Sequence, residues 1–179
     1  LIKEILKNSV DSTHIISTTG FTSRELYQIR SSQKNYKGKD FYVVGAMGHT
    51  SMIALGSSLY GNKKIICLDG DGSILMHLGN INTLSKNSKN IKYVLLNNGC
   101  HESVGGQNTG AFNINFQLIA KAFGFKKYFK ITNVLNMKKV LKNILKQKGT
   151  YFIEVIIATK SISPLTRPKN LISIKKNFM

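Results

Sequence analysis

Residues 64 to 75, KIICLDGDGSIL, contain the pattern that decides the fold. An apolar strand pattern at Lys64–Leu68 runs into a turn rich in glycine and aspartate, and a helical pattern at Ile74–Ser85 follows. A strand that leads through such a turn into a helix is the repeating unit of parallel α/β sheets. The segment therefore predicts an α/β domain with a polar turn at the carboxyl end of a buried strand.

The same alternation of strand and helix patterns extends over the whole chain. We expect strands at His14–Ser17, Phe41–Val44, Lys64–Leu68, Ile91–Leu96, Lys127–Ile131 and Tyr151–Ile156. The expected helices lie at Thr22–Ser31, Thr50–Tyr60, Ile74–Ser85, Phe116–Phe123 and Val134–Gln147, with Gly149 ending the last one. This order predicts a doubly wound parallel sheet of about six strands with helices on both faces.

Length and composition fit one globular domain over residues 1–179, with a surface tail at 159–179 that holds both prolines. The apolar runs are shorter than the roughly 20 residues of a membrane helix, which argues against a membrane protein. Two cysteines and the lack of a secretory leader predict a cytoplasmic protein. The chain opens at Leu1 inside an amphipathic helix pattern, which indicates a piece of a longer protein.

The formal net charge of +18 has three possible explanations. It can reflect a solvated basic surface, a field that attracts an anionic substrate, or a nucleic-acid interface. Only three of the 26 basic residues are arginines (Arg24, Arg30 and Arg167), and arginine is the residue that base readout prefers. Because the lysines are spread along the chain, the pattern favours a solvated surface.

The turn Leu68–Ser73 places one carboxylate, Asp71, between two glycines. Glycines let backbone N–H groups approach an anion, and the N-terminus of the next helix adds partial positive charge. Asp71 would repel a phosphate unless a cation lay between them, and a hard ion such as Mg²⁺ bridges carboxylate and phosphate oxygens. A simple tight turn is the alternative interpretation.

A second polar turn, Asn97-Asn98-Gly99-Cys100, follows the strand pattern at Ile91–Leu96. Asn-Gly favours a turn by itself, but asparagine side chains also offer carbonyl oxygens to Mg²⁺. Asp71 and Asn98 are 27 positions apart, enough for a helix and a returning strand. If the two strands are neighbours, their ends lie about 5 Å apart and both oxygens can reach one ion.

Together, Gly70-Asp71-Gly72 and Asn97-Asn98 resemble the diphosphate-binding motif in the C-terminal, cofactor-binding domain of thiamine-diphosphate-dependent decarboxylases. The resemblance implies that Asp71, Asn98 and the main-chain carbonyl of Cys100 bind Mg²⁺, and that Gly72, Ser73 and the backbone around Ser103 face the diphosphate. The cofactor-binding residues that it implies are Thr19, Gly20, Thr22, Gly45, Met47, Gly48, Gly70, Gly72, Ser73, Asn98 and Ser103.

A third turn, Gly45-Ala46-Met47-Gly48-His49, resembles the segment of this family that bends the cofactor. There a main-chain carbonyl, that of Gly45 here, accepts a hydrogen bond from the aminopyrimidine. A bulky apolar side chain, Met47 here, supports the thiazolium from below. Simple core filling is the alternative for Met47, because methionine suits irregular gaps.

The segments that point to one branch of the family are Thr18–Leu26, Met47–Ser51, Asn98–Gln107 and Arg167–Met179. They resemble the branch that decarboxylates phosphonopyruvate to phosphonoacetaldehyde and CO₂ in phosphonate biosynthesis. Sulfopyruvate decarboxylases, which have a separate subunit of this size, are close relatives, so both substrates stay open. Asn108 is a departure, because the branch has proline there.

His101 and Glu102 lie nearest to the expected reactive centre and are the candidate catalytic residues. His101 can bind an anionic substrate or carry a proton, or it can merely shape the loop, and both interpretations stay open. Arg24 and Arg167 are candidates to bind the second anion of the substrate, because a planar guanidinium suits phosphonate or sulfonate oxygens.

The resemblance implies a carbon–carbon lyase for a small anionic 2-oxo acid, in a homo-oligomer with active sites at its interfaces. In this family a glutamate from a pyrimidine-binding domain activates the cofactor, and we find no such domain in residues 1–179. We therefore expect half of an active site, inactive without a partner domain from the same full-length chain or a separate subunit. The non-enzymatic alternative is a basic nucleic-acid-binding module.

Overall fold

The computed structural model describes residues 1–10, 12–33, 39–60, 64–159 and 164–179. The strands are β1 (His14–Ser17), β2 (Asp40–Tyr42), β3 (Ile65–Gly70), β4 (Ile91–Asn97), β5 (Lys127–Ile131) and β6 (Tyr151–Ile156). The α-helices are α1 (Ile2–Asn8), α2 (Phe21–Ser31), α3 (Thr50–Leu59), α4 (Asp71–Met76), α5 (Gly79–Asn87), α6 (Phe116–Ala122), α7 (Val134–Ile144) and α8 (Leu171–Phe178). Two short 3₁₀ helices, η1 (Glu102–Val104) and η2 (Ala111–Asn113), follow β4.

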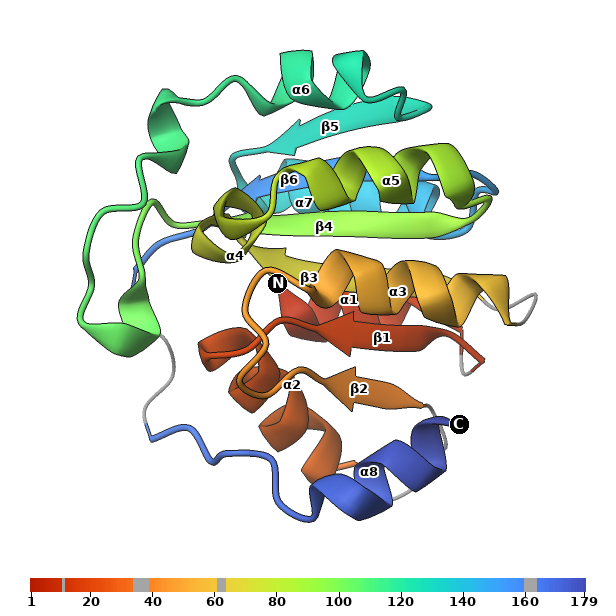
Figure 1. Ribbon diagram of the computed structural model, residues 1–179, viewed down its shortest axis with the longest axis vertical. Helices are drawn as coiled ribbons and strands as arrows, with labels where there is room; N and C mark the ends of the chain where they lie inside the picture. The colour runs from red at the N-terminus through yellow and green to blue at the C-terminus, as the bar shows by residue number, and fades with distance from the viewer. Residues whose placement is uncertain (11, 34–38, 61–63, 160–163) are drawn as a thin grey trace.

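The six strands form one sheet in the order β2-β1-β3-β4-β6-β5, and every pairing is parallel. All the arrowheads in Figure 1 therefore point the same way, so the carboxyl ends share the left-hand edge. The chain runs from β1 outward to β2 and then returns to the other side of β1 for β3. This reversal makes a crevice at the carboxyl ends of β1 and β3, where open α/β sheets bind ligands.

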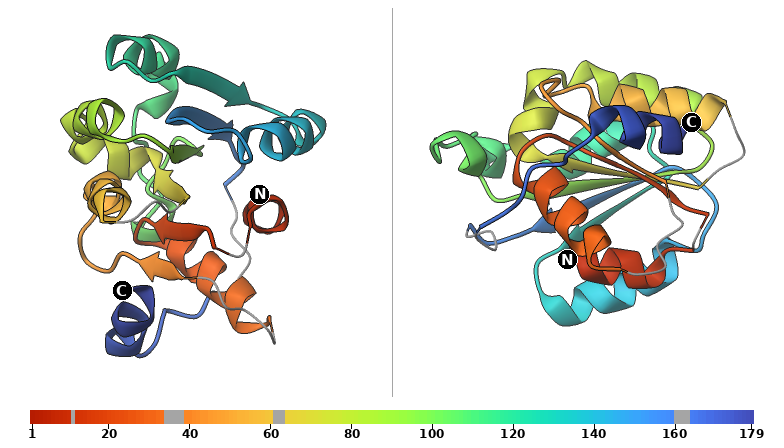
Figure 2. Two further views of the ribbon diagram at one scale, coloured as in Figure 1. Left: turned by 90° about the vertical axis from the view of Figure 1, so that its right-hand side faces the viewer. Right: turned by 90° about the horizontal axis from the view of Figure 1, so that it is seen from below.

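Helices cover both faces of the sheet (Figure 2). On one face α1, α2 and α7 bury Ile5, Leu26 and Leu141 against one side of the strands. On the other, α3, α5 and α6 bury Ala54, Leu84 and Phe116. Burial on both faces explains why strands such as β4 read as continuous apolar runs rather than alternating ones. The predicted doubly wound sheet of six strands is confirmed.

Two predicted helix boundaries were wrong. The pattern at Ile74–Ser85 forms two helices, because His77 leaves the helical conformation (φ −142°, ψ 57°) and separates α4 from α5. The helix expected over Val134–Gln147, with Gly149 as its stop, ends at Ile144. Gly149 instead has φ +128° in the turn before β6, a conformation that favours glycine.

The end of the chain contains a helix that the sequence analysis did not predict. Its first turn is capped by Asn170, whose side chain accepts a hydrogen bond from the N–H of Ser173 at 3.3 Å. Phe178 then packs against His14 and Phe41, with ring centroids 5.2 Å apart in each case. The described part of the predicted surface tail therefore ends by covering the β2 edge of the sheet (Figure 1), and residues 160–163 lie outside the described residues.

Among the described residues, no helix has the length and apolar character that a membrane crossing requires.

Candidate active site

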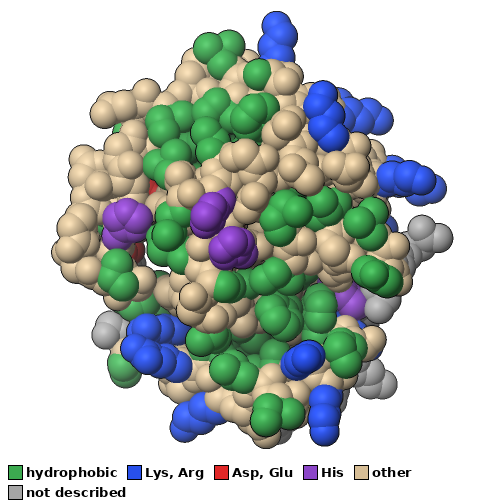
Figure 3. All heavy atoms as spheres, in the orientation of Figure 1, with side chains coloured by type: hydrophobic (Ala, Val, Ile, Leu, Met, Phe, Trp, Pro, Cys, Tyr) green, Lys and Arg blue, Asp and Glu red, His purple; other side chains and the backbone are tan. Residues whose placement is uncertain are grey.

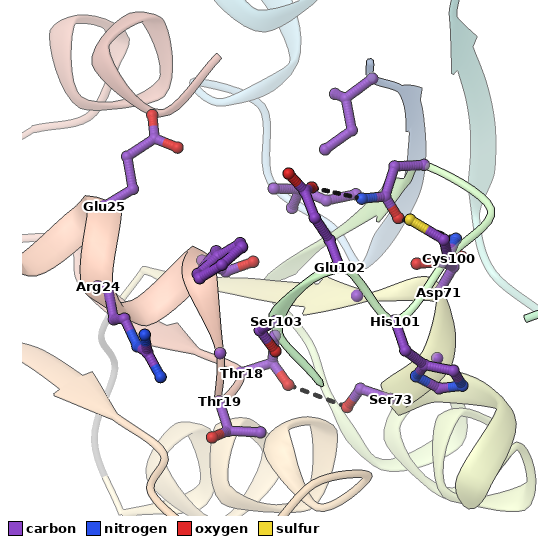
Figure 4. A pocket seen from close by; sticks show the side chains of 18 of the residues that line it. Thr18, Thr19, Arg24, Glu25, Asp71, Ser73, Cys100, His101, Glu102 and Ser103 are labelled. Atoms are coloured by element: carbon purple, nitrogen blue, oxygen red, sulfur yellow. Dashed lines mark hydrogen bonds between the residues drawn. The ribbon is translucent and has the colours of Figure 1, made fainter. Parts of the chain in front are cut away.

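A cavity of about 400 Å³ lies at the carboxyl ends of the strands (Figure 4). Its walls come from the turns after β1, β3 and β4, with Met47 from the turn after β2. All the predicted metal-binding, cofactor-binding and catalytic residues line it except Gly45 and Gly48. Arg24 and Arg167, the candidates for substrate binding, line it as well.

Strands β3 and β4 are neighbours, as the proposed metal site requires. Asp69 pairs with Leu95 and Gly70 with Leu96, so the two polar turns leave the sheet side by side. Asp71 begins α4 with only 3% of its surface exposed, and Thr109 donates a hydrogen bond to its Oδ2 at 2.5 Å. The Asp71 carboxylate is close enough to Cys100 to help raise the pKa of that thiol, after burial and the Glu102 carboxylate.

The turn after β4 is held by its own side chains. The Oδ1 atom of Asn98 accepts a hydrogen bond from the N–H of Cys100 at 3.2 Å, and its Nδ2 donates to Glu102 Oε2 at 3.0 Å. Gly99 has φ +72°, which permits the sharp reversal. Further along, His101 donates its N–H to the carbonyl of Gln107 at 2.8 Å. The segment thus returns on itself and keeps Asn98 and the Cys100 backbone at the cavity wall.

The loop tolerates Asn108 at the position where the family pattern has proline. Asn108 forms an antiparallel bridge with Cys100, but the flanking hydrogen bonds are donated by His101 and Thr109. The bridge does not need the N–H of Asn108, so proline or asparagine can occupy the position.

Gly72, in the turn after β3, is in close contact with side chains from the turns after β2 and β4. A Cβ atom built on Gly72 would come within 2.3 Å of His101 Cε1 and 3.2 Å of Met47 Cε. Glycine is therefore needed for the His101 ring and the Met47 side chain to approach the start of α4 as they do. The contact brings the turns after β2, β3 and β4 together around one point.

Ser73 joins three of the turns through its hydroxyl group. Its Oγ accepts hydrogen bonds from Thr18 Oγ1 and from the N–H of Gly48, both at 3.0 Å. Figure 4 shows the link between Thr18, after β1, and Ser73, at the start of α4. Gly48 is thus placed behind the cavity wall, where its N–H fixes the turn that carries Met47.

Asp69 is a buried acid that the sequence analysis did not select. It is 1% exposed, and burial raises the pKa of its carboxyl group, while hydrogen bonds from Ser73, Tyr93, Gly70 and Thr18 lower it. Tyr93 donates to Asp69 Oδ2 at 2.7 Å from the middle of β4. Asp69 therefore holds the end of β3 in place beneath the contacts of Ser73. Its position directly before Gly70-Asp71-Gly72 was the available signal.

Two arginines, Arg24 and Arg167, line the cavity, together with the carboxylates of Glu25, Asp71 and Glu102. Arg24 projects from α2 with its guanidinium 5.4 Å from the centroid of the Phe21 ring, and Arg167 lies in the segment before α8. Figure 4 shows Arg24 across the cavity from the His101–Ser103 segment. Helix α2 contributes both Arg24 and Glu25, and the turns after β3 and β4 contribute Asp71 and Glu102. The cavity thus offers a cation for an anionic group and carboxylates for a metal ion.

The excess of basic residues does not form one patch on the face seen in Figure 3. There, Lys and Arg side chains stand around the margin, while apolar and histidine side chains occupy the centre. A nucleic-acid interface would need a continuous basic stripe. This face lacks such a stripe.

The donor set at the paired turns fits a hard cation. It consists of the Asp71 carboxylate, the Asn98 amide oxygen and the main-chain carbonyl of Cys100, all oxygens that Mg²⁺ accepts. Within the described ranges no group of three or more His, Cys, Asp or Glu side chains is arranged to hold a metal. A Mg²⁺ ion here would consequently depend on a ligand's own oxygens, which a diphosphate provides.

Comparison with known proteins points to one family. Residues 18–155 match the family model described as "Thiamine pyrophosphate enzyme, C-terminal TPP binding domain". The chain is 33% identical over 156 residues to a phosphonopyruvate decarboxylase of Streptomyces viridochromogenes, covering 87% of this chain and 38% of that protein. It is 38% identical over 152 residues to the sulfopyruvate decarboxylase subunit beta of Methanocaldococcus jannaschii, covering 78% and 77%. The chain thus spans about two fifths of the phosphonopyruvate decarboxylase.

A solved structure supports the fold independently. The 2-oxoglutarate:ferredoxin oxidoreductase from Magnetococcus marinus superposes with a TM-score of 0.72, covering 98% of this chain and 65% of that chain. The sequence identity is 13%, so this likeness concerns the fold alone.

Proposed function

Because the chain belongs to the thiamine pyrophosphate enzymes, as their C-terminal cofactor-binding domain, we propose that its cavity binds thiamine diphosphate through Mg²⁺ in a decarboxylase. One observation carries the proposal: Asp71 and the Asn98–Cys100 turn meet at the ends of two adjacent strands. The relatives at 33% and 38% identity support a decarboxylase of 2-oxo acids.

Asp71, Asn98 and the Cys100 carbonyl would hold Mg²⁺, and Gly70, Gly72 and the Ser103 backbone would face the diphosphate. Short Gly turns let the main chain approach an anion, and Gly20 extends this to the turn after β1. A Cβ built on Gly20 would come within 2.8 Å of Ser103 Oγ, so the two turns close on each other. Thr19 and Thr22, at the start of α2, complete this wall.

Ser73 has a different role in this proposal from the one its position first indicated. Its buried hydroxyl accepts hydrogen bonds from Thr18 and Gly48, so it locks the turns rather than offering that group to a ligand. Only its backbone is left to face the diphosphate. In the neighbouring turn, the Gly45 carbonyl and the Met47 side chain would orient the two rings of the cofactor.

Thiamine diphosphate, when bound, supplies the electron sink for the loss of CO₂. The chain's own residues bind and orient the substrate and move protons beside it. His101, which lines the cavity, would hold or donate a proton, and Glu102, which accepts from Asn98 Nδ2, would fix the loop that carries His101.

The proposed substrate is a 2-oxo acid with a second strong anion, phosphonopyruvate first and sulfopyruvate second. Similarity to both kinds of relative supports this class. Arg24 and Arg167 offer planar guanidinium groups that suit phosphonate or sulfonate oxygens. Plain pyruvate would leave one of these cations without a partner.

The proposal also requires a partner that supplies the activating glutamate. The chain matches 38% of one phosphonopyruvate decarboxylase but 77% of a protein named as a beta subunit, so the partner is either a further domain or a separate subunit. We propose that active sites form at interfaces of an oligomer in the cytoplasm. The two free cysteines are compatible with such a reducing compartment.

A steady-state assay tests this function. The complete enzyme, this chain with its pyrimidine-binding partner, should decarboxylate phosphonopyruvate at least about 100-fold more efficiently than pyruvate, with sulfopyruvate as the third substrate. The chain alone should show no enzymatic turnover. Similar efficiency with pyruvate would contradict the substrate class, and full activity of the chain alone would contradict the need for a partner.

A further inference from the structure

A second carboxylate is buried beside the cavity without lining it. Glu154, on β6, is 2% exposed and receives two hydrogen bonds: one from Asn97 Nδ2 at 2.8 Å and one from the hydroxyl of Tyr128. Lys130 lies 3.9 Å from the same carboxylate, but its side chain is 53% exposed. A buried carboxylate is costly, so such a position calls for a reason.

Asn97 connects Glu154 to the proposed metal turn. It is the last residue of β4, fully buried, and its side chain is used at both ends. The Nδ2 atom donates to Glu154, and the Oδ1 atom accepts a hydrogen bond from the N–H of Gly99 at 3.3 Å. Gly99 lies between Asn98 and Cys100, the two residues of this turn in the proposed Mg²⁺ site.

The orientation of the Asn97 amide is therefore decided by Glu154. A carboxylate can only accept hydrogen bonds, so the NH₂ group of Asn97 must face it. The amide oxygen then faces the turn and accepts from Gly99. Without Glu154 the amide could rotate, and the turn would lose the contact that fixes its direction at the strand end.

We infer that Glu154 is a positioning residue that sets the geometry of the Asn98–Cys100 turn through Asn97 and so tunes Mg²⁺ affinity. This rests on the proposed function of the cavity. Residues that hydrogen-bond metal ligands directly typically alter metal affinity by about 10–100-fold when they are replaced, and Glu154, which acts through Asn97, should fall at the lower end of this range. Tyr128, through the second oxygen of the carboxylate, holds Glu154 itself in place.

The test measures how much Mg²⁺ is needed for thiamine diphosphate to bind the complete enzyme, by calorimetric titration. Glu154→Met keeps a similar volume but removes the acceptor, and we expect it to raise the required Mg²⁺ concentration about tenfold or more. Glu154→Gln keeps an oxygen toward Asn97 and should restore most of the affinity. Thr150→Val, a buried change at the opposite end of β6, is the control for lost stability alone.

Each outcome decides the inference. A normal Mg²⁺ requirement in Glu154→Met would overturn it. So would a Mg²⁺ requirement that Glu154→Gln and Thr150→Val raise as much as Glu154→Met does. If Glu154→Met does not fold, Tyr128→Phe replaces it, with a smaller shift expected in the same direction and no shift overturning the inference. Absence of Mg²⁺-dependent binding in the wild type would instead contradict the proposed function, and the inference with it.

Discussion

Buried polar side chains have different surroundings at the two ends of β4. Near the amino end, Lys92 is 3% exposed and donates to the carbonyl of Gly149 at 2.6 Å and to Asn90 Oδ1 at 3.0 Å. At the carboxyl end, Asn97 is tied to Glu154, but the residues just beyond it face a cavity. Polar burial at one end closes the fold, whereas at the other it supports side-chain oxygens at the wall of the cavity.

This contrast separates structural from functional roles. The partners of Lys92 lie in the turns that lead into β4 and β6, and its Nζ also lies 4.7 Å from the centroid of the Tyr151 ring. Asp71 and Asn98 also have hydrogen-bond partners, but both stand at the wall of the cavity. Substitutions at the two ends should therefore affect different measurements.

The largest expected effect is at the carboxyl end, in Asp71→Ala and Asn98→Ala. Each removes one oxygen ligand, so the diphosphate would face too little positive charge, and cofactor affinity should fall by more than about 100-fold. Calorimetric titration with Mg²⁺ present measures this. Thermal unfolding of the protein without cofactor is measured in parallel, because Asp71 also accepts a hydrogen bond from Thr109 and Asn98 also holds its own turn. Unchanged Mg²⁺-dependent binding in Asp71→Ala would refute the metal assignment.

Met47→Ala should have an intermediate effect that appears in turnover. The diphosphate end anchors the cofactor, whereas Met47 only orients its rings, so kcat should fall about tenfold or more while the Kd of the cofactor changes by less than about threefold. The measurement pairs steady-state kinetics of the complete enzyme with calorimetry. A variant with normal kcat would show that Met47 merely fills the core.

Lys92→Met should have the smallest effect, confined to stability and dependent on pH. Burial lowers the pKa of Lys92 from 10.5 to about 8, with Lys64 and Lys126 as further causes. The unfolded chain therefore binds more protons between these values, and the folded wild type gains stability as pH rises through this window. Relative to Lys92→Met, the gain should reach about 1–2 kcal/mol after solvent screening.

Urea unfolding at pH 7.5, 9 and 10.5 checks this prediction, with cofactor binding measured in parallel. A stability difference between wild type and Lys92→Met that does not vary with pH would contradict it. So would weaker cofactor binding by the variant at neutral pH, because Lys92 lies at the amino end of the sheet.

The sequence predicted most of the fold because each strand is a short apolar run with turn residues around it. Strands β1, β5 and β6 have the predicted bounds. Helix α8 was missed because it depends on tertiary contacts, such as those of Phe178 with His14 and Phe41. The break at His77 was missed for a similar reason, since the periodic apolar pattern continues through it.

The sequence also predicted those site residues whose type and position in a polar turn identify them. The spacing of Asp71 and Asn98 left room for a helix and a returning strand, and the metal site required the two strands to be neighbours; β3 does pair with β4. Asp69 could have been selected from its place directly before Gly70-Asp71-Gly72, whereas Glu154 could not. Glu154 lies in an apolar strand, and its partners Asn97 and Tyr128 come from two other strands. Only the assembled sheet brings these three side chains together.

The most direct test of the central claim is a calorimetric titration of the complete enzyme with thiamine diphosphate, once with Mg²⁺ and once with a chelator. We expect one cofactor bound per copy of this chain with Mg²⁺ and none with the chelator. Equal binding in both conditions, or none in either, would contradict a metal-bridged diphosphate site at the carboxyl ends of β3 and β4.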